Sequence, residues 1–368
     1  MTGGKMKQEG RPVRIVDVAR AVGVSPSTVS KALNDSGSLR PATRERVRAA
    51  ADRLGFVSDA GARALSMRRT FIVGLLSTDD VGRFSMPVML GAENALTVGE
   101  ISTLVATARH DSVREQHHLR TLVARRVDGI IVTGKTTDAR EPIRVPVPVV
   151  YALAPSTDPD DVSVVPDDAA GVRLVVDHLR TLGHRRVAHI GGRADQNTSR
   201  VRLAALRDAL DAAGMDLVGE PLLGEWSEPW GRQAVDLLLR DDQAPPATAV
   251  VCASDQLARA VTDRLRERGL RVPHDVAVTG YDNWEVMWAA SRPPLTTVDM
   301  ELEQLGRRAA ERLLAEIQPE PPEPDAAAGP GTRSDGVGPG TRSDGVGPRG
   351  IELVPPRLVV RGSTIAGD

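Results

Sequence analysis

Apolar and polar positions follow two patterns along most of the chain. From Phe71 onward, short runs rich in Val and Ile predict buried β-strands, and longer segments with an apolar residue every three or four positions predict amphipathic helices. The predicted strands are 71–76, 102–107, 129–132, 147–150, 186–191, 248–253, 276–280 and 355–364. The predicted helices between them are 113–126, 171–182, 202–213, 230–240 and 256–268. Such alternation is typical of parallel sheets with crossover helices, and its length indicates two α/β lobes.

The N-terminal part has a different pattern. Two short helical segments in 15–34 are separated by Gly23, which permits a tight turn, and a third helix is predicted over 43–54. Ser25 is placed to cap the second helix, with Pro26 at its first position, where a missing N–H costs nothing. The apolar residues that can close a small core are Val16, Ala19, Val22, Val24, Val29, Leu33, Val47, Ala50 and Leu54.

The second of these helices has a polar outer face. It carries three hydroxyl side chains and one amine, those of Ser27, Thr28, Ser30 and Lys31. A polar helix of this kind suits the major groove of DNA, so we interpret 15–34 as a helix-turn-helix.

Residues 319–350 break the alternation. Fifteen of these 32 residues are Pro or Gly, and the nonapeptide GPGTRSDGV occurs twice in tandem, at 329–337 and 338–346. Nothing in this composition allows the segment to bury apolar surface, so we expect a flexible insert. A tolerated duplication without a role is favoured over a functional repeat.

The charge is unevenly distributed. Of the 47 Lys and Arg, 14 lie in residues 1–69, which hold only 6 of the 49 Asp and Glu. A basic head on an acidic body indicates a nucleic-acid-binding module joined to a body that does not bind nucleic acid.

Other features narrow the class of protein. Aromatic residues make up only 2%, so the cores must consist mainly of Ala, Val and Leu. The one cysteine, Cys252, lies in a predicted strand and cannot support a disulfide framework. The N-terminus lacks a signal-peptide pattern, and no apolar run reaches the length of a membrane span. We therefore expect a soluble, cytoplasmic protein without membrane partners.

One segment matches a phosphate-binding loop. Residues 129–136, GIIVTGKT, fit G-x-x-x-x-G-K-[ST], whose variable residues must form a loop around a phosphate. Here Ile130, Ile131 and Val132 have the character of a buried strand instead. His110, His117 and His118 lie on a charged helix, which favours a solvated face over a metal site. We predict no catalytic residue, no metal and no cofactor, and hence no enzyme.

The motifs resemble a known family. VDVARAVGVSPSTVSKALN (16–34), followed by TRERVRAAADRLGF (43–56), closely resembles the DNA-binding domain of the LacI/GalR (lactose-repressor) family. RRVDGIIV (125–132), ASDQLA (253–258) and VPHDVAVTGYDN (272–283) are similar to blocks of the same family. The resemblance implies an N-terminal all-α helix-turn-helix head and an α/β body with parallel sheets, in the two-lobed fold of periplasmic binding proteins.

The resemblance also implies a division into domains. Residues 1–57 would form the DNA-binding domain and 58–69 the hinge, with a hinge helix over 60–65. Residues 70–318 and 351–368 would form the ligand-binding and dimerisation domain, interrupted by the insert 319–350. Its near lobe would comprise about 70–182 and 297–318, and its far lobe about 183–296 and 351–365.

The family's functional positions can be carried over one by one. The DNA contacts would be Ser25, Pro26, Ser27, Thr28, Ser30, Lys31, Asn34 and, as a wedge into the minor groove, Leu65. The ligand contacts would be Phe84, Arg202, Trp226, Ser254 and Asp282. A flat apolar face and bidentate charged groups are what carbohydrate recognition needs. The alternatives are a surface ion pair for Arg202 and Asp282, and core packing for Trp226.

Three positions depart from the family pattern. Gly82-Arg83 stands where Asn-Pro is usual, Ser58-Asp59 stands where Pro-Asn is common, and Glu100 stands where a tyrosine is usual. The first departure bears on the class of ligand, and the second on the stability of the hinge.

The resemblance implies a ligand-responsive transcriptional regulator, most often a repressor in this family. It would bind a pseudo-palindromic, double-stranded operator as a homodimer, with a sugar or sugar derivative as effector in the cleft between the lobes. A sugar- or nucleobase-binding protein of the transport type would share the body but not the basic head. The sequence leaves open the effector, inducer against corepressor, the operator, dimer against tetramer, and the role of 329–346.

Overall fold

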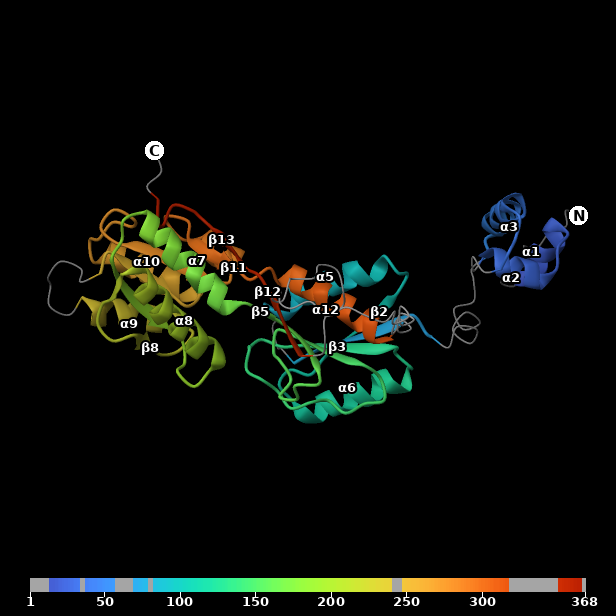
Figure 1. The fold of residues 1–368 in the computed structure, drawn as a ribbon, viewed down its shortest axis with the longest axis horizontal. Coiled ribbons are helices and arrows are strands. Elements are labelled where there is room, and N and C mark those ends of the chain that lie inside the picture. The colour runs from blue at the N-terminus through green and yellow to red at the C-terminus, as the bar shows by residue number, and fades with distance from the viewer. Residues whose placement is uncertain are drawn as a thin grey trace, which may run out of the picture. The chain divides into compact units, whose positions relative to one another are not determined.

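The computed structural model describes residues 13–33, 37–56, 69–78, 82–239, 247–317 and 350–365. They belong to two compact units that divide between Thr70 and Phe71, and each is described by itself (Figure 1). Asn34, the hinge positions 60–65 with Leu65, and the predicted insert up to 349 lie outside the described residues, so these predictions stay untested.

The head unit is a small three-helix domain. Its helices are α1 (Ile15–Val22), α2 (Pro26–Leu33) and α3 (Pro41–Leu54). Two expected core residues were assigned wrongly, since Val16 and Leu54 are 42% and 40% exposed. The inner face of α1 runs through Ile15, Val18, Ala19 and Val22 because these positions, not Val16, recur with the helical period. The buried core consists of Val18, Ala19, Val29, Ala32, Val47, Ala50 and Ala51.

The turn between α1 and α2 forms as the sequence predicts. Gly23 has φ of 72°, in the left-handed region, and its N–H donates to the carbonyl of Ala19 at 2.9 Å. The Ser25 hydroxyl then accepts the backbone N–H of Thr28 at 3.1 Å, which confirms Ser25 as the cap of α2.

The first lobe of the body is built on a six-stranded parallel sheet with the order β12-β5-β4-β3-β1-β2. Helices α5 (Ser85–Thr97) and α12 (Leu302–Ile317) pack on one face, and α6 (Ser112–Ala124) packs on the other. The strands are β1 (Ile72–Ser77), β2 (Ser102–Thr107), β3 (Gly129–Thr133), β4 (Val149–Ala152), β5 (Val162–Pro166) and β12 (Gly350–Val354).

The second lobe contains a sheet with the order β13-β11-β10-β9-β6-β7, and β8 also pairs with β6. Only β13 runs antiparallel to its neighbour among these described strands. The strands of this second sheet are β6 (Arg186–Gly191), β7 (Asp216–Leu217), β8 (Leu222–Leu223), β9 (Ala249–Cys252), β10 (Ala277–Tyr281), β11 (Thr296–Asp299) and β13 (Arg357–Val359).

Helices cover both faces of this second sheet. One core contains residues of α7 and α8, and the other contains residues of α9 and α10. The helices are α7 (Asp168–Thr181), α8 (Asn197–Ala213), α9 (Glu228–Leu238), α10 (Asp255–Glu267) and the short α11 (Glu285–Trp288). The fold therefore confirms two α/β lobes with largely parallel sheets.

The expected lobe boundaries need correction at three elements. Helix α7 packs in the core of the second lobe with α8, and β11 pairs with β10 there, although both were expected in the near lobe. Strand β12 pairs with β5 in the first lobe, although the region from 351 on was expected in the far lobe. The chain thus crosses after β5, after β11 and after β12.

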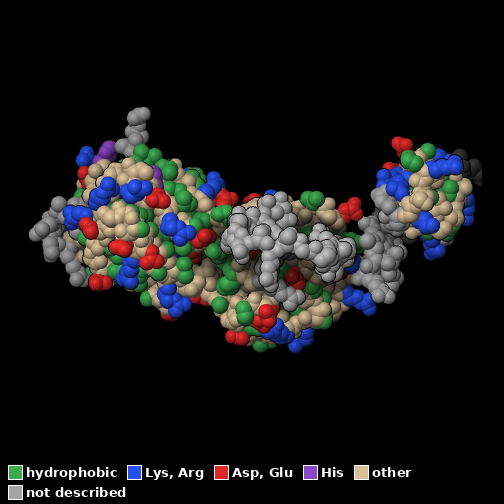
Figure 2. All heavy atoms as spheres, in the orientation of Figure 1, with side chains coloured by type: hydrophobic (Ala, Val, Ile, Leu, Met, Phe, Trp, Pro, Cys, Tyr) green, Lys and Arg blue, Asp and Glu red, His purple; other side chains and the backbone are tan. Residues whose placement is uncertain are grey.

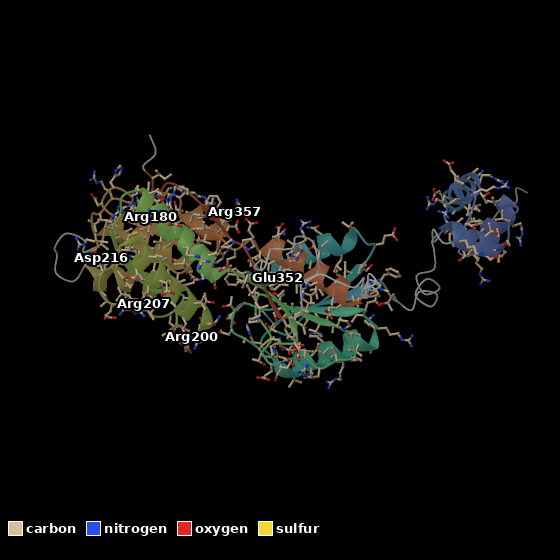
Figure 3. The ribbon with its side chains drawn as sticks, in the orientation of Figure 1. Arg180, Arg200, Arg207, Asp216, Glu352 and Arg357 are labelled. Carbon is tan, nitrogen blue, oxygen red and sulfur yellow. The ribbon has the colours of Figure 1, made fainter. Side chains whose placement is uncertain are left out.

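Glu352 lies in the first lobe and Arg357 in the second (Figure 3), and their ion pairs agree with the corrected assignment. Glu352 of β12 accepts hydrogen bonds from Arg308 and Arg312 of α12, at 2.6 and 3.4 Å. Arg357 of β13 is bonded instead to Asp299, at the end of β11, at 2.8 Å. The third crossing therefore lies between Glu352 and Arg357.

The segment that resembles a phosphate loop is a strand. Residues Gly129–Thr133 form β3, all five are buried, and β3 lies between β1 and β4. The interpretation of GIIV as a core strand is confirmed. Among the described residues, no helix combines the length and the apolar character needed to cross a bilayer.

Candidate functional site

A cavity of about 340 Å³ opens where the two lobes meet. Its lining residues follow the carboxyl ends of strands from both sheets, which is where ligands bind in open α/β folds. The first lobe contributes loops after β1, β3 and β4, and the second lobe contributes loops after β6, β9, β10 and β11. All five residues expected at the ligand site line this cavity: Phe84, Arg202, Trp226, Ser254 and Asp282.

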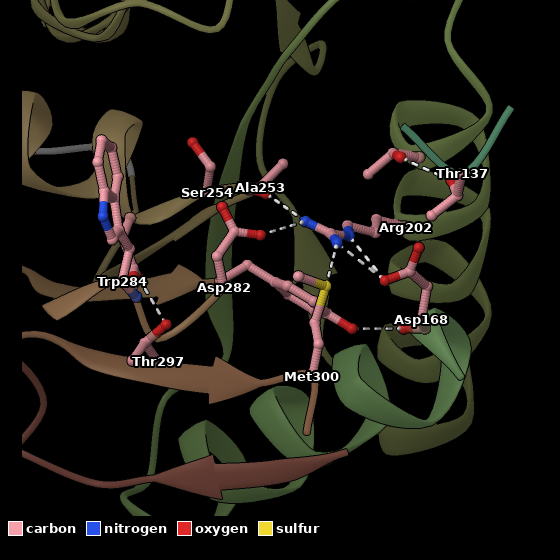
Figure 4. A network of polar contacts seen from close by, with 12 residues as sticks. Thr137, Asp168, Arg202, Ala253, Ser254, Asp282, Trp284, Thr297 and Met300 are labelled. Carbon is pink, nitrogen blue, oxygen red and sulfur yellow. Dashed lines mark hydrogen bonds and ion pairs between the residues drawn. The ribbon is translucent and has the colours of Figure 1, made fainter. Parts of the chain in front are cut away.

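Arg202 of α8 is the centre of a buried polar network (Figure 4). Its Nε and Nη2 donate to Oδ1 of Asp168 at 3.0 and 2.9 Å, and its Nη1 donates to the carbonyl of Ala253 at 2.7 Å. Nη1 also lies 3.5 Å from Oδ1 of Asp282. The guanidinium stacks 3.5 Å from the ring centroid of Tyr281. Arg202 therefore joins α7, α8 and the ends of β9 and β10.

The alternative of a surface ion pair is wrong for this network. The side chains of Arg202 and Asp282 are only 4% and 6% exposed. Burial alone would lower the pKa of Arg202, but the carboxylate of Asp168 and its neighbours outweigh it and raise the pKa. The guanidinium therefore stays charged, and its bonds to protein atoms hold it in one orientation.

Asp282 is held between two cations from different lobes. Its Oδ1 faces Arg202, and its Oδ2 accepts a hydrogen bond from Nη2 of Arg83 at 2.5 Å. Asp282 and Asn283 have φ of 101° and 49°, so the chain turns sharply after β10 and brings the carboxylate into the cavity wall. Burial raises the pKa of Asp282, while Arg83 and Arg202 oppose that rise.

Asp255 lies near Asp282, and the sequence analysis did not predict it as a site residue. Its Oδ1 accepts the hydroxyl of Thr297 at 2.5 Å, and its Oδ2 accepts the backbone N–H of Trp284 at 2.6 Å. Burial, reinforced by the charge of Asp282, raises the pKa of Asp255 to about 8. The neighbouring Ser254 lines the cavity, and its hydroxyl caps α10 by accepting the N–H of Leu257 at 3.3 Å.

The four tryptophans divide between core and cavity. Trp226 and Trp284 line the cavity, whereas Trp230 and Trp288 pack on the core of the second lobe. Trp230 also donates to the carbonyl of Gly191 at 3.0 Å. Trp226 also contacts that core, and its Nε1 donates to the side-chain carbonyl of Gln196. The alternative of core packing is therefore confirmed for Trp226, which also forms part of the cavity wall.

Arg83 is a cavity residue whose role the sequence did not reveal. Its guanidinium lies 4.6 Å from the ring centroid of Phe84 and 3.9 Å from that of Trp284. Its ion pair with Asp282 joins a loop of the first lobe to a loop of the second. The available signal was the departure at Gly82-Arg83, where the family usually has Asn-Pro.

The loop after β3 forms another part of the wall. The hydroxyl of Thr137 lies 2.8 Å from that of Thr198, and the backbone N–H of Asn197 donates to Asp138 at 2.7 Å, so the lobes also touch here. Lys135 lines the same side of the cavity and is exposed. Among the described residues, it has neither an acidic partner nor a hydrogen bond.

The head carries a second candidate surface. Ser25, Pro26, Ser27 and Lys31 are exposed on α2, and Thr28 and Ser30 are half-buried. The Ser25 hydroxyl also lies 2.8 and 2.9 Å from those of Ser27 and Thr28. Lys and Arg side chains are spread over the visible face of this unit (Figure 2).

Two family models match the chain. The model for bacterial regulatory proteins of the lacI family matches residues 14–59, which include the three helices of the head. The model for the periplasmic binding protein-like domain matches residues 176–333. The second match runs through most of the second lobe and α12.

Two relatives extend the match over most of the chain. The HTH-type transcriptional repressor PurR of Aliivibrio fischeri (strain MJ11) is 31% identical over 311 residues, which are 83% of this chain and 91% of that protein. The HTH-type transcriptional regulator CelR of Thermobifida fusca is 36% identical over 331 residues, which are 87% of this chain and 96% of that protein.

Solved structures show the same fold. The lac repressor dimer bound to operator and the anti-inducer ONPF is similar with a TM-score of 0.67 and 26% identity, covering 97% of this chain and 100% of that one. The complex of the transcriptional regulator CelR with cellobiose is similar with a TM-score of 0.60 and 29% identity, covering 96% and 100%.

Proposed function

Because the chain belongs to the lacI family of bacterial regulatory proteins, we propose that it is a DNA-binding transcriptional repressor controlled by a small polar effector. It binds a pseudo-palindromic operator as a homodimer, and the effector binds between the lobes and changes the affinity for DNA. The similarity to a lac repressor dimer bound to operator and ONPF supports this assignment across nearly the whole chain.

The observation that carries the proposal is the cavity between the lobes. It joins residues of both sheets, and Arg83, Asp282, Thr137 and Thr198 already link its two sides. A ligand that touches both lobes binds one relative arrangement better than another, and so shifts the population of lobe arrangements. The cavity can therefore convert ligand binding into a change of shape.

The proposed effector is a sugar or sugar derivative. Trp226 and Phe84 offer apolar ring surfaces at the wall, and Ser254, Arg202 and Asp282 contribute polar groups. The ligand in the CelR complex is cellobiose, which supports a carbohydrate here as well. The bonds of Arg202 to Asp168 and Ala253 give it a positioning role as well as a place in the wall.

The proposed DNA contacts lie on α2. Ser27 and Lys31 would face base edges, with Thr28 and Ser30 on phosphates and Pro26 in apolar contact. Ser25, as the cap, fixes the start of the helix. Asn34 and the wedge Leu65 complete the proposed set but lie outside the described residues.

The proposal assigns a different function to each domain of the chain. Residues 1–57 bind DNA, 58–69 act as the hinge, and the body from 70 on binds the effector and dimerises. We place the protein in the cytoplasm, where the DNA is, and assign it no catalytic activity. A transport-type binding protein is the lesser alternative, because it would not need a lacI-type head.

The proposal is tested by selecting operator fragments. The full chain is mixed with random duplex DNA, and bound fragments are recovered and sequenced. We expect two inverted half-sites, with an affinity that falls steeply as salt rises because the basic head displaces counterions. Recovery of unrelated sequences with uniformly weak binding would contradict the assignment.

A further inference from the structure

The cavity wall contains two cations in addition to Arg202, the one that the sequence predicted for binding sugar hydroxyls. Arg83 follows β1, and Lys135 follows β3, the strand next to β1 in the sheet of the first lobe. The side chain of Arg83 is 19% exposed, and Lys135 is exposed. Both are donors without acceptor capacity, so a ligand group that meets them must be an acceptor.

The carboxylate expected to bind sugar hydroxyls is already engaged. Oδ2 of Asp282 accepts Nη2 of Arg83 at 2.5 Å, and Oδ1 lies 3.5 Å from Nη1 of Arg202. Arg83 also covers the ring of Trp284, at 3.9 Å from its centroid. A sugar hydroxyl that bonds Asp282 directly would have to displace a guanidinium from a buried partner, and breaking such a pair leaves an uncompensated charge.

Cations outnumber anions among the described residues that line the cavity. Arg83 and Arg202 are matched by Asp282 and Asp168. Asp255 adds little negative charge near neutral pH, because burial raises its pKa to about 8. The charge of Lys135 is not balanced by an acidic partner among the described residues. Asp138, in the same loop as Lys135, does not line the cavity and accepts the backbone N–H of Asn197. The described lining therefore holds three cations, Arg83, Lys135 and Arg202, and one anion, Asp282, beside aromatic rings and Thr, Ser and Gln side chains.

Resting on the proposed function, we propose that the effector carries an acid group that binds between Arg83 and Lys135, while its sugar ring lies against Trp226. The shared chemistry is an anionic oxygen group on a sugar, either a carboxylate or a phosphate. Arg83 stays on Asp282 through one nitrogen, and its remaining N–H donors face the acid. Arg83 and Lys135 thus determine the specificity of the cleft.

The test is a comparison of matched neutral and acidic sugars by calorimetry on the full chain. The probes are glucose, glucuronate and glucose 6-phosphate, with cellobiose and cellobionate as the disaccharide pair. We expect at least one acid to bind ten-fold or more tightly than its neutral partner, and added salt to weaken only the acid. Comparison of glucuronate and cellobionate with glucose 6-phosphate shows whether the preferred acid group is a carboxylate or a phosphate.

Two variants assign the preference to these residues. Lys135→Met should reduce the acid-to-neutral affinity ratio about ten-fold, and because Lys135 is exposed it should not disturb folding. Arg83→Gln keeps a donor for Asp282 but removes the charge, and should reduce the same ratio. Arg207→Met removes an exposed charge of α8 and serves as the matched control, with an unchanged ratio.

Three results would overturn the inference. They are equal or tighter binding of the neutral sugars, an unchanged ratio in Lys135→Met, and no binding of any acidic probe by a chain that still binds its operator. The last result leaves the proposed repressor function standing, because operator selection tests that function separately.

Discussion

At the scale of single residues, Arg202 shows how a residue of the cavity wall also supports the fold. Its guanidinium bonds Asp168 and Ala253 and faces Asp282. Arg202, Asp168 and Ala253 are buried, and the side chain of Asp282 is only 6% exposed. Removing one partner of a buried charge network leaves the others uncompensated. We therefore expect Arg202→Met to lower the free energy of unfolding by about 3–5 kcal/mol, measured by urea denaturation of the full chain.

The control for this prediction lies on the same helix. Arg207 is exposed on α8, so Arg207→Met should change the free energy of unfolding by less than about 0.5 kcal/mol. Equal effects of the two substitutions would mean that the buried network does not need its cation.

Asp255 makes the stability depend on pH. Burial raises its pKa to about 8, and the charge of Asp282 adds to this rise, whereas Arg83 opposes it. In the unfolded chain the pKa is about 4, so between these values the folded state holds a proton that the unfolded state has lost. This contribution to stability is present below about pH 4 and is lost as the pH rises through about 8.

We therefore expect the melting temperature of the wild type to fall between about pH 5 and pH 9 relative to that of Asp255→Asn. Asparagine keeps the shape and can still accept the N–H of Trp284, but it does not titrate. Parallel curves for the two proteins would show that Asp255 is ionised throughout. Because Asp255 and Asp282 interact, the transition belongs to the pair rather than to one residue.

Most of the candidate site could be predicted, and what was missed depends on tertiary contact. Phe84, Ser254 and Asp282 each follow a predicted strand, and the carboxyl ends of parallel strands meet at one edge. The partner of Arg83 lies 199 residues along the chain, so nothing local identifies it. Lys135 belongs to a phosphate-loop sequence pattern, but the residues before it form strand β3 and not such a loop, so the pattern did not predict its place in the cavity wall.

At the scale of elements, α5 and α12 pack unusually closely. A Cβ on Gly306 would overlap the carbonyl of Val88, and one on Gly91 would overlap that of Glu303. Helix propensity alone would make Gly306→Ala stabilising by about 1 kcal/mol. We expect the opposite sign, because the two helices would have to separate from a core that is packed like a crystal.

The measurement is thermal unfolding of Gly306→Ala beside Arg307→Ala. The adjacent Arg307 is exposed on α12, so its replacement changes the helix without touching the contact. A lower melting temperature for Gly306→Ala alone supports close packing. A higher one would mean that the helices separate at little cost.

Helix α2 provides a second prediction at this scale. Lys31 is exposed in its last turn, so in the proposed complex its amine reaches a base edge, with guanine O6 and N7 as suitable acceptors. Lys31→Ala should change which half-site bases are recovered in the operator selection. A uniform loss of affinity for all sequences would assign Lys31 to a phosphate instead.

The limits of individual elements were more predictable than their placement. The strands expected at 102–107 and 186–191 have those limits in the structure. Helix α5 was not expected, because Pro87 and Gly91 interrupt its pattern, yet Pro87 lies in the first turn, where it is tolerated. The alternating pattern does not indicate which sheet an element joins, so α7, β11 and β12 were assigned to the wrong lobes.

At the scale of the whole molecule, polar contacts already join the lobes at the cavity. They are the Arg83–Asp282 ion pair, the Thr137–Thr198 hydroxyl contact and the bond from Asn197 to Asp138. An effector that binds in this cavity, as proposed, strengthens or weakens the arrangement in which these contacts form. The proposed control of DNA binding depends on this change in the relation of the lobes.

If effector and operator are coupled, the coupling must be reciprocal. The factor by which the effector changes operator affinity has to equal the factor by which operator changes effector affinity, typically about 5–150-fold. We expect anisotropy titrations of operator with and without the tightest-binding sugar, and calorimetry of that sugar with and without operator, to give the same factor. Asp282→Asn should reduce the factor towards one, because it weakens the ion pair with Arg83 that joins the lobes at the cavity. Two unequal factors in the wild type would show that a further equilibrium, such as dimerisation, is linked to binding.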